Sequence, residues 1–236
     1  MRENNLISVT PFSITRILGI IAFLLVLANI GGLFSKFVLG HGSLKGLVPL
    51  FILDKEKNIP TFFSVLLMLS ATLLLVIITL VNIKNRLPHV SKWGLLSFGF
   101  LYMAFDEAFQ FHERLTLPAK TLLNEKNLGI FYSAWVIPGI ALVVFLGLFF
   151  LRFLLYLPAK TRFRFLMAAT FYIGGAIGME CVGGKYFEIH GTFDLTYGII
   201  TTVEESLEIT GLIFFIWALL KYCAENYKEV RFQFGG

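Results

Sequence analysis

The sequence contains little charge and few cysteines. Only 15% of its 236 residues are Asp, Glu, Lys or Arg, whereas a soluble domain carries about 25%. The two cysteines, Cys181 and Cys223, form no Cys-x-x-Cys pair, which excludes a disulfide-knit secreted domain and a zinc ribbon. The chain also contains no Glu-x-x-His and no His-Glu-x-x-His, so neither a ferritin-like di-iron bundle nor a zinc protease helix is expected.

Apolar residues take the place of the missing charge. Hydrophobic residues make up 57% of the chain, Phe alone contributes 26, and the mean hydropathy is +0.78. Because a soluble globule contains about 45–50% apolar residues, a cytosolic enzyme and a disordered chain are both excluded. We therefore predict an all-α fold, a polytopic membrane helical bundle in which residues 1–236 form one transmembrane domain.

Six apolar segments are long enough to cross a bilayer, which takes about 20 residues of helix. Asn58 and Pro60 stand before the second segment, where they suit the N-cap and the first turn of a helix. Pro138 falls inside the fourth segment and predicts a kink. The predicted spans are 13–38, 61–83, 93–113, 130–156, 164–187 and 195–222.

The positive charges indicate an orientation. With the N-terminus in the cytoplasm, 12 Lys and Arg residues fall on the cytoplasmic side and 8 on the other side, in the sense of the positive-inside rule. We predict a multi-pass protein of the bacterial cytoplasmic (inner) membrane with both termini inside. Cys181 and Cys223 then lie near opposite faces of the bilayer and do not pair.

The partners follow from the same distribution of charge. The formal net charge of +5 is scattered between the spans and forms no basic stripe, so no nucleic acid is expected. The lipid bilayer is the expected partner. A homo-oligomer and a larger membrane complex both stay open.

Seven acids lie inside predicted spans. Each charged group at the centre of a bilayer costs about 2.5–3.5 kcal/mol on insertion scales. Such groups must face the bundle interior, where they pair, take up protons or bind cations. These acids are Asp106, Glu107, Glu113, Glu180, Glu204, Glu205 and Glu208.

Helical spacing sorts the acids of the third span. Asp106, Gln110 and Glu113 recur at i, i+4 and i+7, which places them on one face of a continuous helix. His112 stands next to Glu113 and lies at the edge of that face. The third span is therefore expected to direct two carboxylates inward, with an imidazole at the rim.

The fifth and sixth spans carry matching acids. Glu204 and Glu208 are four residues apart and share a face. Glu180 shares its face with small residues, which permit a close approach by another helix. Gly174 and Gly178 form a separate GxxxG pair, which predicts a packing seam. On the predicted topology, all three spans present carboxylates at similar depth in the outer half of the bilayer.

These acids predict a cation site. Carboxylates suit Ca²⁺, Mg²⁺ or Mn²⁺, and an imidazole widens the choice to Zn²⁺ and iron. Glu205 is the candidate general base on metal-bound water. The alternative is protonated packing groups, above all for Glu107 and Glu205, which point away from the shared faces. The predicted ligands of a divalent metal ion are Asp106, His112, Glu113, Glu180, Glu204 and Glu208.

Three motifs occur together along the chain. They are Leu-Asp-Lys-Glu-Lys-Asn-Ile-Pro-Thr at 53–61, Phe-Asp-Glu at 105–107 with His-Glu at 112–113, and Glu-Glu-Ser-Leu-Glu at 204–208. Over residues 45–222 the chain resembles a family of uncharacterised bacterial six-span integral membrane proteins, whose commoner form has Leu in place of Phe105. The resemblance implies an architecture and candidate residues but no activity. Asp54, Glu56 and Asn58 of the first motif would cover the mouth of the site.

Three functions fit this pattern. The first is a metal-dependent membrane enzyme acting on a lipid or another membrane-soluble substrate. The second is a transporter or channel for protons or divalent cations. The acids stop near mid-membrane, however, and the inner halves of their helices offer no matching polar path. The third is a non-catalytic subunit of a membrane complex, in which the acids serve assembly.

Overall fold

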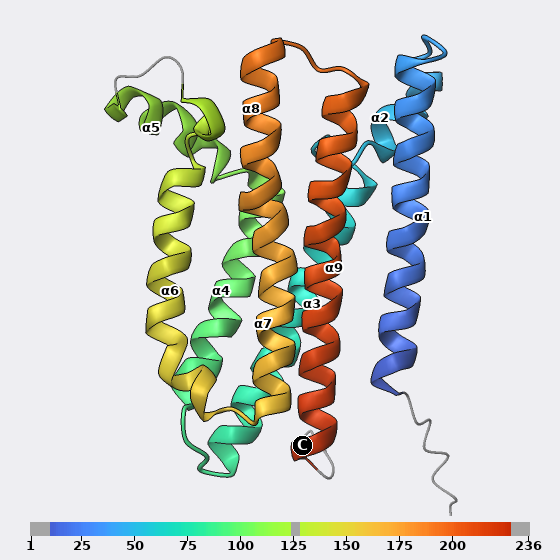
Figure 1. The fold of residues 1–236 in the computed structure, drawn as a ribbon. Helices are drawn as coiled ribbons and strands as arrows, with labels where there is room; N and C mark the ends of the chain where they lie inside the picture. The colour runs from blue at the N-terminus through green and yellow to red at the C-terminus, as the bar shows by residue number, and fades with distance from the viewer. Residues whose placement is uncertain (1–9, 124–127, 228–236) are drawn as a thin grey trace, which may run out of the picture.

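The computed structural model describes residues 10–123 and 128–227, which fold into a bundle of long helices lying side by side (Figure 1). One of them is continuous from Ala159 to His190 and contains a π-helical segment, η4. The long elements are α1 (Pro11–Phe37), α3 (Ile59–Lys84), α4 (Val90–Phe109), α6 (Val136–Tyr156), α7 (Ala159–Ile173), η4 (Gly174–Met179), α8 (Glu180–His190) and α9 (Leu195–Asn226).

The two ends of the bundle differ. The short helices α2 (Leu47–Phe51) and α5 (Thr116–Leu123) lie at one end, which we call the α5 end. The start of α1 and the end of α9 lie at the other, the terminal end (Figure 1). Short connections at the α5 end also include η1 (Leu44–Gly46), η2 (Glu113–Leu115) and η3 (Gly129–Phe131).

Most of the long helices have the character of membrane spans. Five helices of the described residues are long and apolar enough to cross a bilayer: α1, α3, α6, the continuous α7–α8 and α9. The 20 residues of α4 include Lys92, Asp106 and Glu107, and α4 is not among the five. The fold is thus that of a multi-pass membrane protein. A sixth crossing and the cytoplasmic position of the termini stay predictions.

Of the two predictions made from prolines, the helix start at Asn58 and Pro60 is confirmed and the kink at Pro138 is not. Asn58 is the N-cap of α3, with its Oδ1 accepting a hydrogen bond from the Thr61 N–H at 3.1 Å, as predicted. The predicted kink at Pro138 is wrong, because α6 begins at Val136 rather than near residue 130. Pro138 therefore lies in the first turn, where a backbone N–H has no intrahelical partner to lose.

A close seam joins η4 and α7 to α9. A methyl group at Gly175 would lie 2.7 Å from the Glu204 carbonyl oxygen, and one at Gly211 would lie 2.7 Å from the Tyr172 nitrogen. At Gly174 and Gly178 it would meet nothing within 4 Å. The predicted Gly174–Gly178 seam is therefore wrong, because the wider turn of η4 places Gly175 against α9 instead.

The terminal half of the bundle has an aromatic and aliphatic core. Trp93 is 2% exposed and packs its ring edge-on against Phe153, with the centroids 5.1 Å apart. Phe100 stacks on Phe215 at 4.6 Å. Buried residues of α3 and α9, among them Leu75 and Leu219, complete this core. It closes the bundle from the terminal end up to the level of the acids.

Candidate functional site

The end of α4 brings a histidine back onto an aspartate. α4 stops at Phe109, because Gln110 adopts a positive φ of 56° and donates its N–H to the Asp106 carbonyl at 2.6 Å. The chain then folds back, so that the His112 backbone N–H donates to Asp106 Oδ1 at 2.9 Å. The His112 Nδ1 atom lies 2.7 Å from Asp106 Oδ2. The helical face predicted for Asp106, Gln110 and Glu113 is therefore wrong, although Asp106 and His112 do come together.

This contact changes the role of Asp106. Both of its carboxylate oxygens bond to His112, whose ring packs edge-on against Trp135 at 4.6 Å. Burial lowers the pKa of His112, but the hydrogen bond and charge of Asp106, together with Glu113, outweigh it and raise the pKa above its ordinary value. When Nδ1 donates to Asp106, the other ring nitrogen presents a lone pair. Asp106 thus orients His112, as carboxylates do for metal-binding histidines.

The π-helical segment η4 positions Glu180, the first residue of α8. The Glu180 N–H bonds to the Gly175 carbonyl, five residues back, so Glu180 follows the wide turn directly. Gly175 is the residue that packs against Glu204 and Glu208. Accordingly, the Glu180 carboxyl lies close enough to those of Glu204 and Glu208 for their charges to interact. π turns inside helices are frequent at functional sites.

Two acids expected to point away belong to the same group. Glu205 lies within electrostatic range of Glu208 and Glu107. Glu208 in turn neighbours Glu107 and Glu180 and reaches the Tyr172 hydroxyl. The separate orientation predicted for Glu107 and Glu205 stays a prediction, but the charges of both carboxyl groups interact with that of Glu208.

The loop before α3 adds further acids. The buried Asn29 side chain donates to Thr202 Oγ1 at 2.7 Å and accepts from the Leu53 N–H at 3.0 Å, which ties this loop to α1 and α9. Part of the Asp54 side chain is exposed to solvent, while other protein atoms crowd round its carboxyl group. Burial raises the pKa of Asp54 to about 7, and the charges of Glu180, Glu113 and Glu56 contribute.

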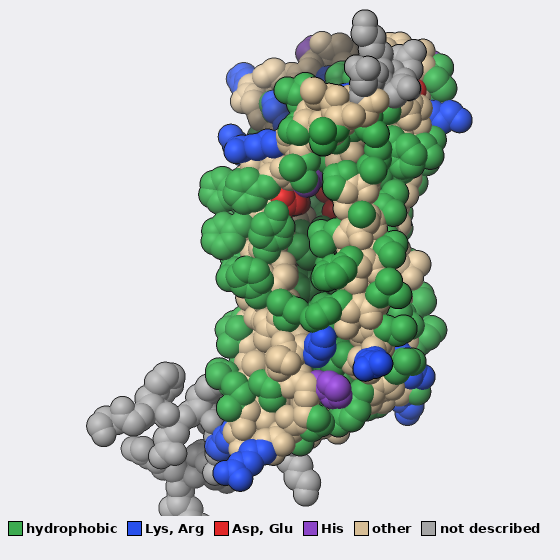
Figure 2. Space-filling model, turned by 90° about the vertical axis from the view of Figure 1, so that its left-hand side faces the viewer, with side chains coloured by type: hydrophobic (Ala, Val, Ile, Leu, Met, Phe, Trp, Pro, Cys, Tyr) green, Lys and Arg blue, Asp and Glu red, His purple; other side chains and the backbone are tan. Residues whose placement is uncertain are grey.

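We call these ten groups the acid cluster. Six of its acids, on α4, α8 and α9, are half-buried rather than sealed. In the described residues, two sealed side-chain atoms lack a partner, Thr161 Oγ1 and Glu188 Oε1, and neither belongs to the cluster. Figure 2 shows acidic and histidine side chains inside a hollow bordered by apolar surface. The members are Asp54, Glu56, Asp106, Glu107, His112, Glu113, Glu180, Glu204, Glu205 and Glu208.

The cluster does not have the arrangement of a formed metal centre. No three His, Cys, Asp or Glu side chains in residues 10–123 and 128–227 are arranged to hold one ion. The charges nevertheless crowd a single region, and such repulsion is relieved by protons or by cations. Because Glu side chains are flexible, they can rotate toward a cation. The six predicted metal ligands stay a prediction.

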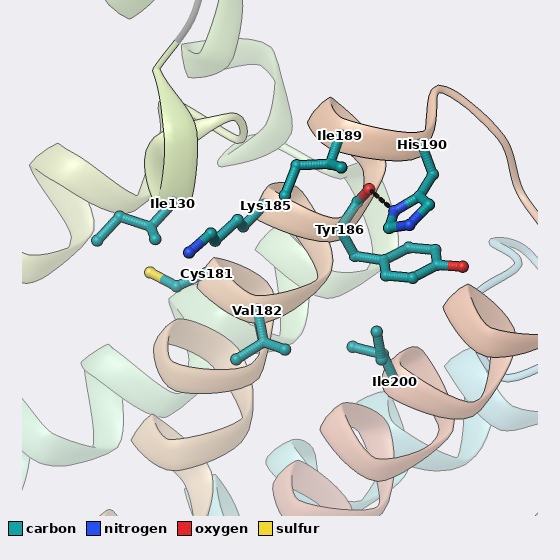
Figure 3. Close-up of a pocket in the computed structure, with 8 residues that line it drawn as sticks. All are labelled: Ile130, Cys181, Val182, Lys185, Tyr186, Ile189, His190 and Ile200. Atoms are coloured by element: carbon teal, nitrogen blue, oxygen red, sulfur yellow. Dashed lines mark hydrogen bonds between the residues drawn. The ribbon is translucent and has the colours of Figure 1, made fainter.

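Two recesses lie apart from the cluster. One, of about 290 Å³, is formed by Ile130 with residues of α8 and α9 and is almost wholly apolar (Figure 3). His190 lies there, with its ring stacked on Tyr186 at 4.1 Å, and so takes no part in the acid cluster. The other, of about 420 Å³, lies at the terminal end and is lined by Asn82, Trp93 and Tyr227 among others.

Both cysteines are free, as predicted. Cys181 lies at the start of α8, on the edge of the apolar recess, whereas Cys223 lies near the terminal end of α9. Their separation along the bundle agrees with the predicted positions near opposite faces of the bilayer.

The helices and the acid cluster define a multi-pass helical membrane protein with a polar hollow toward one end. Residues 17–223 match the model of the family described as "Domain of unknown function (DUF8692)", and the chain belongs to this family. No curated protein and no solved structure matches the chain. The family agrees with the predicted resemblance to uncharacterised proteins, while the bacterial origin and the diagnostic motifs stay predictions.

Proposed function

We propose that the chain is a metal-dependent membrane enzyme that acts on a lipid or another membrane-soluble substrate. Its setting is the bacterial inner membrane, with both termini in the cytoplasm. The observation that carries the proposal is the acid cluster together with the Asp106–His112 pair, half-buried in a hollow. A hollow of this kind supplies ligands, a proton acceptor and access for water in one place.

Each residue has a role in this proposal. The free ring nitrogen of His112 and the carboxylates of Glu113, Glu180, Glu204 and Glu208 would hold a divalent cation. Asp106 would orient His112 rather than bind the ion directly. Glu205, which lies within electrostatic range of Glu208 and Glu107, would accept a proton during attack by water. A divalent ion would supply Lewis-acid chemistry and neutralise the crowded charge.

The closed terminal half supports an enzyme rather than a conduit. A transporter for protons or cations needs polar groups along its whole path. Below the acid cluster, the bundle is filled by Phe100 stacked on Phe215 and by Trp93 against Phe153. A site open toward one end only suits a reaction in which substrate and product share one route.

Elemental analysis of the full-length protein, purified without chelator, tests the proposal. We expect a divalent metal at about one or two ions per chain, and little metal in an Asp106→Asn, Glu208→Gln variant of equal thermal stability. A metal-free protein, or equal metal content in the two proteins, would contradict the metal site. Monodisperse, metal-loaded protein without other subunits would also argue against a purely structural role in a complex.

A further inference from the structure

One face of α6 stands away from the bundle at its middle. Val136, Val143 and Phe150 are seven residues apart and share this face. Val136 and Phe150 are 0% and 8% exposed, whereas Val143 is only half-buried. No residue from Ile137 to Phe149 is buried. The face is therefore covered at both ends and uncovered between them.

α4 and α6, or the residues that directly follow and precede them, are in contact at the same two levels. Toward the terminal end, the Lys92 ammonium lies 3.2 Å from the centre of the Phe149 ring, and Trp93 packs against Phe153. Toward the α5 end, His112 packs against Trp135. Figure 2 shows the face of the molecule on the α6 side, where a hollow runs between apolar surfaces and contains acidic side chains. We call the space between these two contact levels the α4–α6 slot.

The rim of the slot has the opposite charge to its interior. The segment that joins α4 to α6 carries Arg114, whose guanidinium carbon lies 5.7 Å from the Phe111 ring centre, and Lys120, whose ammonium lies 4.0 Å from the Tyr132 ring centre. Figure 2 shows Lys and Arg side chains on this face beyond the level of the acids. An amphiphile with an acyl chain and an anionic head group would match this order of apolar walls, acidic interior and basic rim.

We propose that the α4–α6 slot admits a phospholipid sideways from the bilayer, with an acyl chain along Val143 and the phosphate at Arg114 and Lys120. The inference rests on the proposed function, because it names the substrate class of the same site. The apolar walls bind the chain, the two cations pair with the phosphate, and the ester region comes to lie at the acid cluster. The Lys92–Phe149 contact closes the slot toward the terminal end.

Photo-crosslinking in nanodiscs tests this inference. The probe is phosphatidylglycerol with a diazirine in one acyl chain, added to the full-length protein in the presence of chelator. We expect adducts on α4 and α6 residues that face the slot, including Val143. A Val143→Trp variant fills the slot and should lower the adduct yield about 10-fold. A Leu148→Trp variant, at an α6 position that is 69% exposed, should leave the yield unchanged.

Further variants and a second probe separate binding of the head group from binding of the acyl chain. An Arg114→Gln, Lys120→Gln variant should lower labelling by the phosphatidylglycerol probe but not by an uncharged diacylglycerol probe. If Val143→Trp proves unstable, Val143→Phe fills less of the slot and should still lower the adduct yield, whereas Leu148→Phe should not. Equal yields in the two Trp variants, or adducts confined to the outer face of α6, would overturn the inference. Because the labelling needs no metal, its failure is separate from a failure of the metal site.

Discussion

The two halves of the bundle use the same helices for different purposes. In the terminal half, α4 and α9 contribute Trp93, Phe215 and Tyr222 to a buried aromatic and aliphatic core. In the α5 half, they contribute Asp106 and Glu208 to a half-buried polar region. Closely packed cores transmit strain and favour one structure, whereas crowded carboxylates oppose folding. The comparison indicates that the terminal half holds the bundle together against the repulsion of the α5 half.

The largest expected effect comes from the terminal half. Trp93→Ala removes a ring that contacts Phe153 and Tyr222 and should lower the free energy of unfolding by about 3–5 kcal/mol. Denaturant titration in mixed micelles measures it. Phe98→Ala, at a 65% exposed position of the same helix, is the control and should change little. A similar loss of unfolding free energy in both variants would contradict the idea that the terminal core stabilises the bundle.

The second-largest expected effect on stability comes from the close contact between η4 and α9. Gly175→Ala places a methyl group 2.7 Å from the Glu204 carbonyl oxygen, and overpacking of this kind costs about 1–3 kcal/mol. Gly147→Ala is the matched control, because a methyl group there meets nothing within 4 Å. In a helix interior, that change should be neutral or stabilising. Thermal melting of the two variants distinguishes them, and a stable Gly175→Ala protein would show that the seam is not tight.

The repulsion in the α5 half predicts a pH dependence. Because the pKa of Asp54 is raised to about 7, the folded protein binds more protons here than the unfolded chain. The resulting stability is fully present below the ordinary pKa of about 3.9 and is lost as pH rises through 7. Asp54→Asn should therefore stabilise the protein above pH 7 relative to the wild type and leave it unchanged near pH 4. A pH-independent difference would contradict this account.

The smallest expected effect is a change in the pKa of the His112 ring. Asp106→Asn removes the negative charge and one of the two acceptor oxygens that face His112, so the pKa of His112 should fall, since burial then acts with less opposition. In the wild type, the stability from this raised pKa is present below about pH 6.5 and is lost as pH rises through the folded value. Histidine NMR in nanodiscs measures the shift. An unchanged pKa would mean that Asp106 does not control His112.

The helices were largely predictable from the sequence, and their local irregularities were not. Hydropathy located all the long helices to within a few residues at most ends, because apolar length is a strong signal. It missed the end of α4 at Phe109, where the Asp106 side chain binds the returning chain. It also missed the π turn of η4 before Glu180. Both features depend on contacts that periodicity does not contain.

The membership of the candidate site was predictable only in part. Spacing brought Glu204 and Glu208 to one face and matched them in depth to Glu180. It also placed Glu205 three residues before Glu208, and the charges of these two residues interact in the folded chain. Asn29 had no signal in the sequence, because an Asn in an apolar span reveals its partners Thr202 and Leu53 only after the chain has folded.

Titration with Mn²⁺, followed by electron paramagnetic resonance, tests the central claim most directly. Full-length wild-type protein should bind Mn²⁺ in a saturable site, and Glu208→Gln should weaken that binding by about 10-fold or more. Glu225→Gln, which changes an acid of the terminal end paired with Arg164 at 2.9 Å, should leave the binding unchanged. Equal Mn²⁺ affinity in the wild type and both variants, or no saturable binding, would contradict a cation site in the acid cluster.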